Sequence, residues 1–252
     1  MLRFVALVLL ALVSGPAAAA IFAVDDRVTM PAGPELAAIG IVTGGENILY
    51  GSGFLIDACT VLTARHVGGS VDKLVGRQLT FHAGKLSSEG QIVAAGPFQS
   101  GSSEQRSIGK DWMIIRLSQC LGRQLGFLRL STASAVFAGK HEFKVEDAGF
   151  PRDRAVTAGV TVDPDCRVLW VGRGMIAHDC ATLPGNSGGP LIARDNAGWV
   201  AIGINAAGAD RAAAEPFRAT EANIAVDVSK LAPNICLFIS KDTNETLCAS
   251  PK

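Results

Sequence analysis

The chain has 252 residues, of which 48% are hydrophobic, and its 23 basic side chains balance its 23 acidic ones. This length is enough for one large or two small hydrophobic cores. The absence of net charge gives no reason to expect a nucleic-acid partner, which a strongly basic chain would suggest.

The first twenty residues have the layout of a secretory signal peptide. Arg3 gives a positive start, residues 4–13 are uninterrupted apolar, and residues 14–20 are small residues with one proline. The apolar run is too short to cross a bilayer as a helix, and no later stretch reaches that length. We therefore predict that a signal peptide, residues 1–20, is removed, that the mature protein has no membrane anchor, and that it is secreted or periplasmic.

The rest of the chain consists of short strand-like runs separated by glycine-rich turns. The first series comprises residues 37–42, 48–56, 60–63, 78–81, 91–95 and 112–117. The second series, after Gly126, comprises residues 144–148, 155–162, 167–171, 190–193, 199–204 and 224–226. Short strands at this spacing, without helical periodicity between them, predict an all-β barrel or sandwich. Asp227 is an acceptable N-cap for one terminal helix, which we expect to break near Pro233.

Three segments carry residue types suited to nucleophilic catalysis. Residues 185–190 (GNSGGP) place a serine among glycines, which lets the backbone turn sharply while N–H groups point at one spot. Residues 63–66 (TARH) end one apolar run, and Asp111 opens another. A serine hydroxyl needs a base, and an imidazole oriented by an acid can supply one. Alone, each segment could be a surface turn, a buried histidine or an exposed strand end.

The order of these residues excludes one class of hydrolase. A serine in a G-x-S-x-G pattern also marks the nucleophile of α/β-hydrolases, but there the histidine follows the serine. The histidines of this chain all precede Ser187, at His66, His82, His141 and His178. A subtilisin-type order would need an acid before the histidine, and no early aspartate lies in a recognisable block.

The three segments resemble the catalytic blocks of trypsin-like serine peptidases of the chymotrypsin fold, in the family's order histidine, aspartate, serine. The resemblance implies an all-β fold of two six-stranded Greek-key β-barrels with a short C-terminal helix. One barrel would lie in residues 21–126 and the other in residues 127–252, with the active site between them. It implies a secreted serine endopeptidase. The residues implied for catalysis are the base His66, the acid Asp111 and the nucleophile Ser187, with an oxyanion hole made by the N–H groups of Gly185 and Ser187.

The same resemblance implies where the side chain before the cleaved bond (P1) would bind. The pocket residues would be Ala181, Thr182, Asn205, Ala206, Ala207 and Gly208. Ala181 is neutral, whereas a preference for basic P1 residues needs an acid there. Thr182 and the sequence G-N-S-G resemble the glutamyl endopeptidase branch, but that branch has a histidine where Asn205 stands. We therefore expect small or uncharged P1 residues first, with Glu or Gln second.

Asn186 differs from the residue that digestive members of the family have before the nucleophile. Those enzymes have an aspartate, which pairs with a newly cut N-terminal amine and switches the enzyme on. The amide of Asn186 carries no charge and cannot form that ion pair. We therefore expect an enzyme that is active once its signal peptide is removed, or that is controlled by another route.

The six cysteines all lie in the predicted mature chain, and an even number in an exported protein indicates disulfides. Cys166 and Cys180 bracket a segment typical of a hairpin, so we expect them to pair. The family fold places Cys59 beside Cys120, which leaves Cys236 for Cys248. Because no C-x-x-C motif or Cys/His cluster is present, we expect no metal site.

Two other functions remain compatible with these blocks. A catalytically inactive relative could serve as a binding module, although all three catalytic residue types are intact. An esterase on the same fold would use the same machinery, because acyl transfer to water needs the same groups. We expect a monomer that acts on polypeptides and uses no cofactor. Labelling by an organophosphonate and a comparison of peptide with ester substrates would separate these alternatives.

Overall fold

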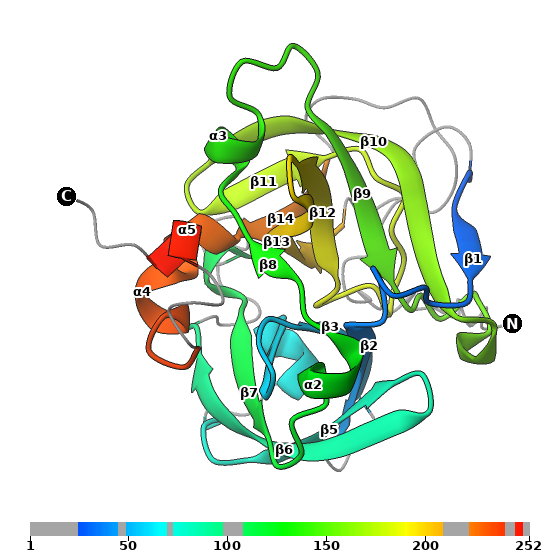
Figure 1. Ribbon diagram of the computed structural model, residues 1–252, viewed down its shortest axis with the longest axis vertical. Helices are drawn as coiled ribbons and strands as arrows, with labels where there is room; N and C mark the ends of the chain where they lie inside the picture. Colours follow the sequence, from blue (N-terminus) through cyan, green and yellow to red (C-terminus); the bar gives the residue numbers. More distant parts are fainter. Residues whose placement is uncertain are drawn as a thin grey trace, which may run out of the picture.

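The computed structural model describes residues 25–44, 49–69, 73–97, 108–208, 222–239 and 245–248. The predicted signal peptide, residues 1–20, lies outside these ranges. Figure 1 shows two β-barrels packed against each other, one built from strands within residues 39–117 and the other from strands within residues 144–227. Across the described ranges, no helix is long and apolar enough to span a membrane.

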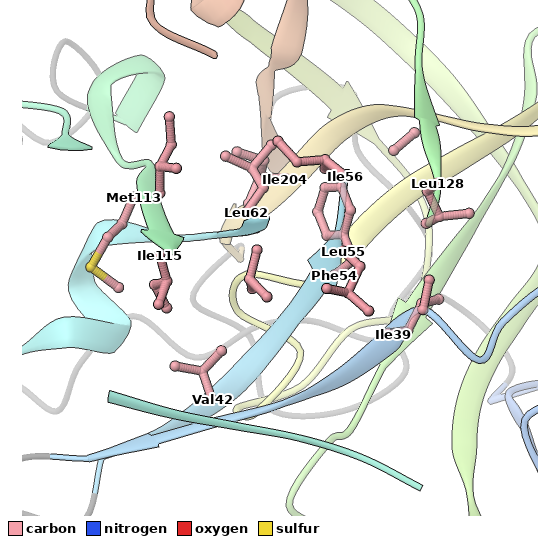
Figure 2. Packing of buried hydrophobic residues seen from close by; sticks show 14 of the residues in the cluster. Ile39, Val42, Phe54, Leu55, Ile56, Leu62, Met113, Ile115, Leu128 and Ile204 are labelled. Atoms are coloured by element: carbon pink, nitrogen blue, oxygen red, sulfur yellow. The ribbon is translucent and has the colours of Figure 1, made fainter. Parts of the chain in front are cut away.

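The first barrel is a closed ring of six antiparallel strands in the order β2–β3–β4–β7–β6–β5. Its strands are β2 (Ile39–Gly44), β3 (Leu49–Leu55), β4 (Thr60–Thr63), β5 (Gln78–Ala83), β6 (Leu86–Ala95) and β7 (Met113–Leu117). In β5 the buried residues Leu79, Phe81 and Ala83 alternate with more exposed ones, as expected for a strand with one face on a core. Figure 2 shows the resulting core, which Ile204 of β13 (Gly198–Ala207) joins from the second barrel.

The second barrel also closes, because β9 pairs with both β10 and β12. Its ring runs β9–β10–β11–β14–β13–β12. The other five strands are β9 (Lys144–Gly149), β10 (Val160–Gly172), β11 (Met175–His178), β12 (Pro190–Asp195) and β14 (Asn223–Asp227). The short strands β1 (Val28–Met30) and β8 (Arg129–Leu130) add to β10 and β13. The prediction of an all-β fold with two six-stranded barrels is confirmed, whereas the domain boundary at residue 126 stays a prediction.

Strand β10 differs from the sequence prediction of two separate strands, residues 155–162 and 167–171. It runs through both because it pairs with β9 on either side of an irregularity between Asp163 and Cys166. Residues Val156–Ala158 form a 3-10 turn instead of a strand. The break in register allows one long strand to continue across a polar stretch that local pattern alone separates.

The helical elements are short. They are η1 (Arg65–Gly68), η2 (Ile108–Lys110), α2 (Gly122–Leu125), α3 (Ala133–Val136), η3 (Val156–Ala158), η4 (Val228–Leu231), α4 (Ala232–Ile235) and α5 (Glu245–Cys248). The Asp227 carboxylate accepts a hydrogen bond from Ser229 N at 2.9 Å and so caps η4. The expected break near Pro233 is present, because η4 ends at Leu231 and α4 begins at Ala232. Pro233 stands in the first turn of α4, where its missing N–H is not needed.

Three disulfides link Cys59 with Cys120, Cys166 with Cys180 and Cys236 with Cys248, and among the described residues no cysteine is free. These are the pairs that the sequence led us to expect. Cys166 and Cys180 connect β10 to the segment after β11, which leads into the loop that carries Ser187. Cys236 and Cys248 tie α4 to α5.

Arg27 anchors the N-terminal segment with a buried guanidinium. Its side chain is only 1% exposed and donates to Asp25 Oδ1 at 2.8 Å and to Asp153 Oδ2 at 2.7 Å. Asp153 lies in the loop that follows β9, and the same loop reaches the nucleophile loop where Arg152 N donates to Pro184 O at 2.8 Å. The segment before β1 is therefore fastened to the loop next to the candidate site.

We expect Arg27→Ala to lower the free energy of unfolding by about 3 kcal/mol, because charge-assisted hydrogen bonds contribute about 1.5–3 kcal/mol each. Arg154→Ala is the matched control. Arg154 contacts the same two carboxylates, but its side chain is 37% exposed, so about 1 kcal/mol or less should be lost. Urea unfolding of the three proteins measures both values. Equal losses in the two variants would contradict the role of Arg27 as the anchor.

Candidate active site

His66 and Asp111 meet because their strands are neighbours. His66 lies in η1, just after β4, and Asp111 precedes β7, which pairs with β4 at Thr63 and Met113. His66 Nδ1 lies 2.6 Å from Asp111 Oδ2, and the backbone N–H of His66 donates to Asp111 Oδ1 at 2.9 Å. Asp111 is 1% exposed. Because each of its carboxylate oxygens contacts a different nitrogen of His66, it holds the histidine at two points.

The pKa of His66 is set by two opposing effects. Burial of the ring lowers it, while the charge of Asp111 and its hydrogen bond raise it. The carboxylate outweighs the burial, so the pKa lies above its ordinary value. About a third of the side chain, 34%, remains exposed, which leaves the imidazole accessible from solvent. The pair can therefore hold a proton on Nδ1 while the other ring nitrogen, Nε2, accepts a proton from a neighbouring group.

Ser187 reaches the same region through contacts between the barrels. Its carbonyl oxygen accepts a hydrogen bond from Ser52 N of β3 at 2.8 Å. Gly51 of β3 touches both catalytic segments, because a Cβ there would lie 2.5 Å from Val67 of η1 and 2.9 Å from Ser187 O. A hydrogen bond between the Ser187 hydroxyl and His66 is absent from the described part of the chain. Such contacts are often long before substrate binds.

The loop around Ser187 leaves two N–H groups open. Three others have carbonyl acceptors, with Asn186 N bound to Leu183 O, Gly188 N to Asn205 O and Gly189 N to Asn186 O. In the ranges that the structure describes, the N–H groups of Gly185 and Ser187 have no acceptor. Gly185 has a φ of +108°, where L side chains rarely fit, and a Cβ there would lie 2.5 Å from Phe150 O. This conformation gives the loop two donors for an oxygen anion.

The residues expected around the P1 pocket differ in exposure. Ala181 and Thr182 are 3% and 4% exposed, while Ala206, Ala207 and Gly208 are partly exposed. Asn205 is only 2% exposed, and its amide donates to Asp147 inside the second barrel. The Asn205 side chain therefore points into the barrel interior.

Two acids behind this region were not singled out from the sequence. Asp163 Oδ2 accepts a hydrogen bond from Ala181 N, and Asp147 lies on β9 with 1% exposure. Burial raises the pKa of Asp163 to about 6 and that of Asp147 to about 7. The signal for Asp147 was present, since it follows buried Val145 by two residues and so shares the core face of its strand.

His178 lies in β11 and is fully buried, so it does not line an exposed wall. Burial lowers its pKa to about 3, against a smaller opposing effect of the neighbouring Asn205 side chain. Neither ring nitrogen has a partner in hydrogen-bond geometry among the described residues. One group of possible metal ligands occurs in the described ranges, Asp163 with Cys166 and Cys180. Its two sulfur atoms are joined in a disulfide and are not available to a metal.

The family model described as Trypsin matches residues 34–235. Among solved structures, one described as a Glu endopeptidase in complex with MPD superposes with a TM-score of 0.61. The match covers 82% of this chain and 93% of the other at 16% sequence identity, and a likeness of this kind shows the fold alone. No curated protein matches the sequence.

Proposed function

The chain belongs to the trypsin family of serine peptidases, and from this premise we propose that it is an exported endopeptidase acting through His66, Asp111 and Ser187. The observation that carries the proposal is the pairing of His66 with Asp111, at 2.6 Å between Nδ1 and Oδ2. A buried carboxylate at this nitrogen leaves the other ring nitrogen free to act as a base.

The proposed reaction has two halves. The Ser187 hydroxyl attacks the substrate carbonyl carbon while His66 Nε2 takes its proton, and Asp111 stabilises the imidazolium. The carbonyl oxygen becomes an anion that the N–H groups of Gly185 and Ser187 bind, each worth about 3 kcal/mol of barrier. His66 then protonates the leaving amine, and the acyl-enzyme remains. The oxygen of a water then attacks the acyl carbon while His66 takes a proton from that water, and the bond to Ser187 Oγ breaks as His66 returns the proton to Oγ and the acid leaves.

Export is the proposed context of this activity. Disulfides persist in oxidising compartments, and the described residues form three of them. Together with the signal peptide predicted in residues 1–20, they support a secreted or periplasmic protein, which we propose acts as a monomer. The proposed mature chain has one barrel in residues 21–126 and the other in residues 127–252, and it binds polypeptide without a cofactor.

An activity-based organophosphonate tests the proposed function, because it reacts only with an activated serine. We expect a single covalent adduct on Ser187, found by peptide mapping, and a parallel loss of peptide hydrolysis. The protein unfolded in urea is the control and should not be labelled. Absence of labelling in the folded protein would indicate an inactive relative. Labelling without any cleavage of peptides, but with cleavage of esters, would indicate an esterase.

The proposed pocket predicts a preference for small or uncharged P1 residues, with Glu or Gln second through Thr182 alone, because the Asn205 amide is bonded to Asp147. Ala181 is neutral, and the nearest buried acid, Asp163, is only 4% exposed and already accepts a hydrogen bond from Ala181 N. Burying an unpaired Lys or Arg cation in this pocket would cost several kcal/mol of binding free energy. That cost is enough to suppress cleavage after Lys or Arg by orders of magnitude.

A positional-scanning peptide library measures this P1 preference. Strong cleavage after Arg or Lys would contradict this prediction and would mean that an acid from elsewhere in the chain, such as Asp210 or Glu215 outside the described residues, pairs with the P1 cation.

A further inference from the structure

Asp147 is a buried carboxylate held by two neutral amides. It lies on β9 inside the second barrel, opposite Leu191 of β12 and Asp163 of β10. Asn186 Nδ2 donates to Asp147 Oδ2 at 2.6 Å, and Asn205 Nδ2 donates to Asp147 Oδ1. Each carboxylate oxygen therefore has one amide donor.

The two amides belong to the two segments that frame the nucleophile. Asn186 directly precedes Ser187, and its backbone oxygen accepts from Gly189 N at 2.8 Å. Asn205 holds the other side of the loop with its backbone, which accepts from Gly188 N at 2.7 Å and donates to Gly189 O at 2.9 Å. One carboxylate thus connects both sides of the Ser187 loop from within the barrel.

One other polar group lies beside these amides, the buried imidazole of His178, whose pKa is lowered by burial and raised to a smaller extent by the side chain of Asn205. The Oδ1 atoms of Asn186 and Asn205 are buried and have no hydrogen-bond partner among the described residues. A buried acceptor without a partner is destabilising, so the oxygens do not hold the amides in place. The bond to Asp147 therefore orients the Asn186 amide, and it orients the Asn205 amide beside His178.

The position of Asp147 is unfavourable for an ion. Burial raises its pKa to about 7, the charge of Asp163 raises it further, and the two amides and Arg27 oppose the shift. None of the ion pairs between described residues includes Asp147. A carboxylate in such a place is expensive to bury unless it is paired, so stability alone gives little reason for it.

We propose that Asp147 is a positioning residue for the nucleophile loop, an inference that rests on the proposed peptidase function. Its carboxylate fixes the amides of Asn186 and Asn205, and these hold the N–H groups of Gly185 and Ser187 in the arrangement that binds the oxyanion. The anchor lies inside the barrel and needs no newly cut N-terminal amine. It takes the place of the ion pair that the uncharged Asn186 cannot form.

A double-mutant cycle between Asp147 and Asn186 tests the proposal. Asp147→Asn puts an amide nitrogen where a carboxylate oxygen accepted, so a donor faces a donor. Asn186→Asp puts two carboxylates together. We expect each single variant to lower kcat about 100-fold, the size of effect that a small misplacement of a catalytic group produces, with KM changed less than about threefold. The double variant D147N/N186D restores one donor for each acceptor and should recover kcat to within about fivefold of the native value.

Glu146→Gln is the matched control, because it makes the same change of acid to amide one residue earlier on the other face of β9. It should leave kcat unchanged. Native kcat in Asp147→Asn, or a double variant no more active than Asn186→Asp, would overturn the proposal. If Asp147→Asn does not fold, the kcat of Asn186→Asp compared with that of the double variant still tests the proposal. Failure of the native protein to cleave peptides or react with the phosphonate would instead count against the proposed function.

Discussion

Ser187→Ala is expected to lower kcat about a million-fold and to leave the protein folded. The substitution removes the one oxygen that His66 would activate, so no acyl-enzyme can form. Ser187 is partly exposed, and within the described ranges its hydroxyl makes no hydrogen bond, so the free energy of unfolding should change by about 0.5 kcal/mol or less. Initial rates on a fluorogenic peptide, together with urea unfolding, measure the two effects.

The matched control for this substitution is Ser134→Ala. Ser134 is an exposed serine of α3 whose hydroxyl contacts only Thr132 at 3.0 Å among the described residues. It should retain full activity. Substantial hydrolysis by the Ser187→Ala protein would mean that another nucleophile carries the reaction, and the proposed triad would then be wrong.

Asp111→Asn is expected to lower kcat about ten-thousand-fold in a folded protein. Both carboxylate oxygens of Asp111 are acceptors, one for the backbone N–H of His66 and the other for Nδ1–H. An asparagine has one oxygen and one NH₂ group, so it can satisfy only one of these donors. If its NH₂ group faces Nδ1, the imidazole carries its proton on Nε2 and cannot accept the proton of Ser187.

Asp179→Asn serves as the control for the charge change. Asp179 is another acid in the segment that leads to Ser187, and its Oδ1 accepts a hydrogen bond from Arg167 N at 2.6 Å. Because it contacts neither His66 nor Ser187 in the described structure, we expect its variant to keep kcat within a few-fold of native. Steady-state kinetics on one peptide substrate compare both variants. An Asp111→Asn protein with native kcat would show that a different acid orients His66.

The local pattern of the sequence predicted an all-β fold because a strand on a core follows a local rule, whereas the two barrels were implied by the family resemblance. Alternation of buried and exposed residues recurs every second position, so a run such as residues 78–81 was recognisable without knowing its neighbours. Residues 112–117 were recognisable as a short apolar run instead, since their strand is buried at almost every position. Glycine has a similar local logic. A positive φ at Gly185 and Gly188 excludes most other residues, so the turn around Ser187 is visible in the sequence itself.

The limits of strands were harder to predict, since partners decide them. Residues 155–162 and 167–171 were expected as two strands, but β10 spans 160–172 because β9 pairs with it across the irregular stretch. The short strand β1 carries little pattern of its own and exists because β10 offers it an edge at residues 160–162. Hydrogen bonding between distant segments, unlike alternation, leaves no mark in a local window.

The catalytic residue types could be read from the sequence, but the arrangement of the buried polar groups could not. Asp147 lies 39 residues from Asn186 and 58 from Asn205, and Arg27 lies 126 residues from Asp153. The alternation along a strand predicts on which face of the sheet a side chain lies. It does not predict which side chains of other strands will contact it once the barrel closes. The family resemblance implied that Asn205 lines the P1 pocket. Its amide points inward instead, because Nδ2 donates a hydrogen bond to Asp147 in the barrel interior. The sequence thus determined the strands and the turn at the nucleophile. Closure of the two barrels decided which polar groups became partners, because a buried donor or acceptor takes whatever partner the fold brings within hydrogen-bonding distance.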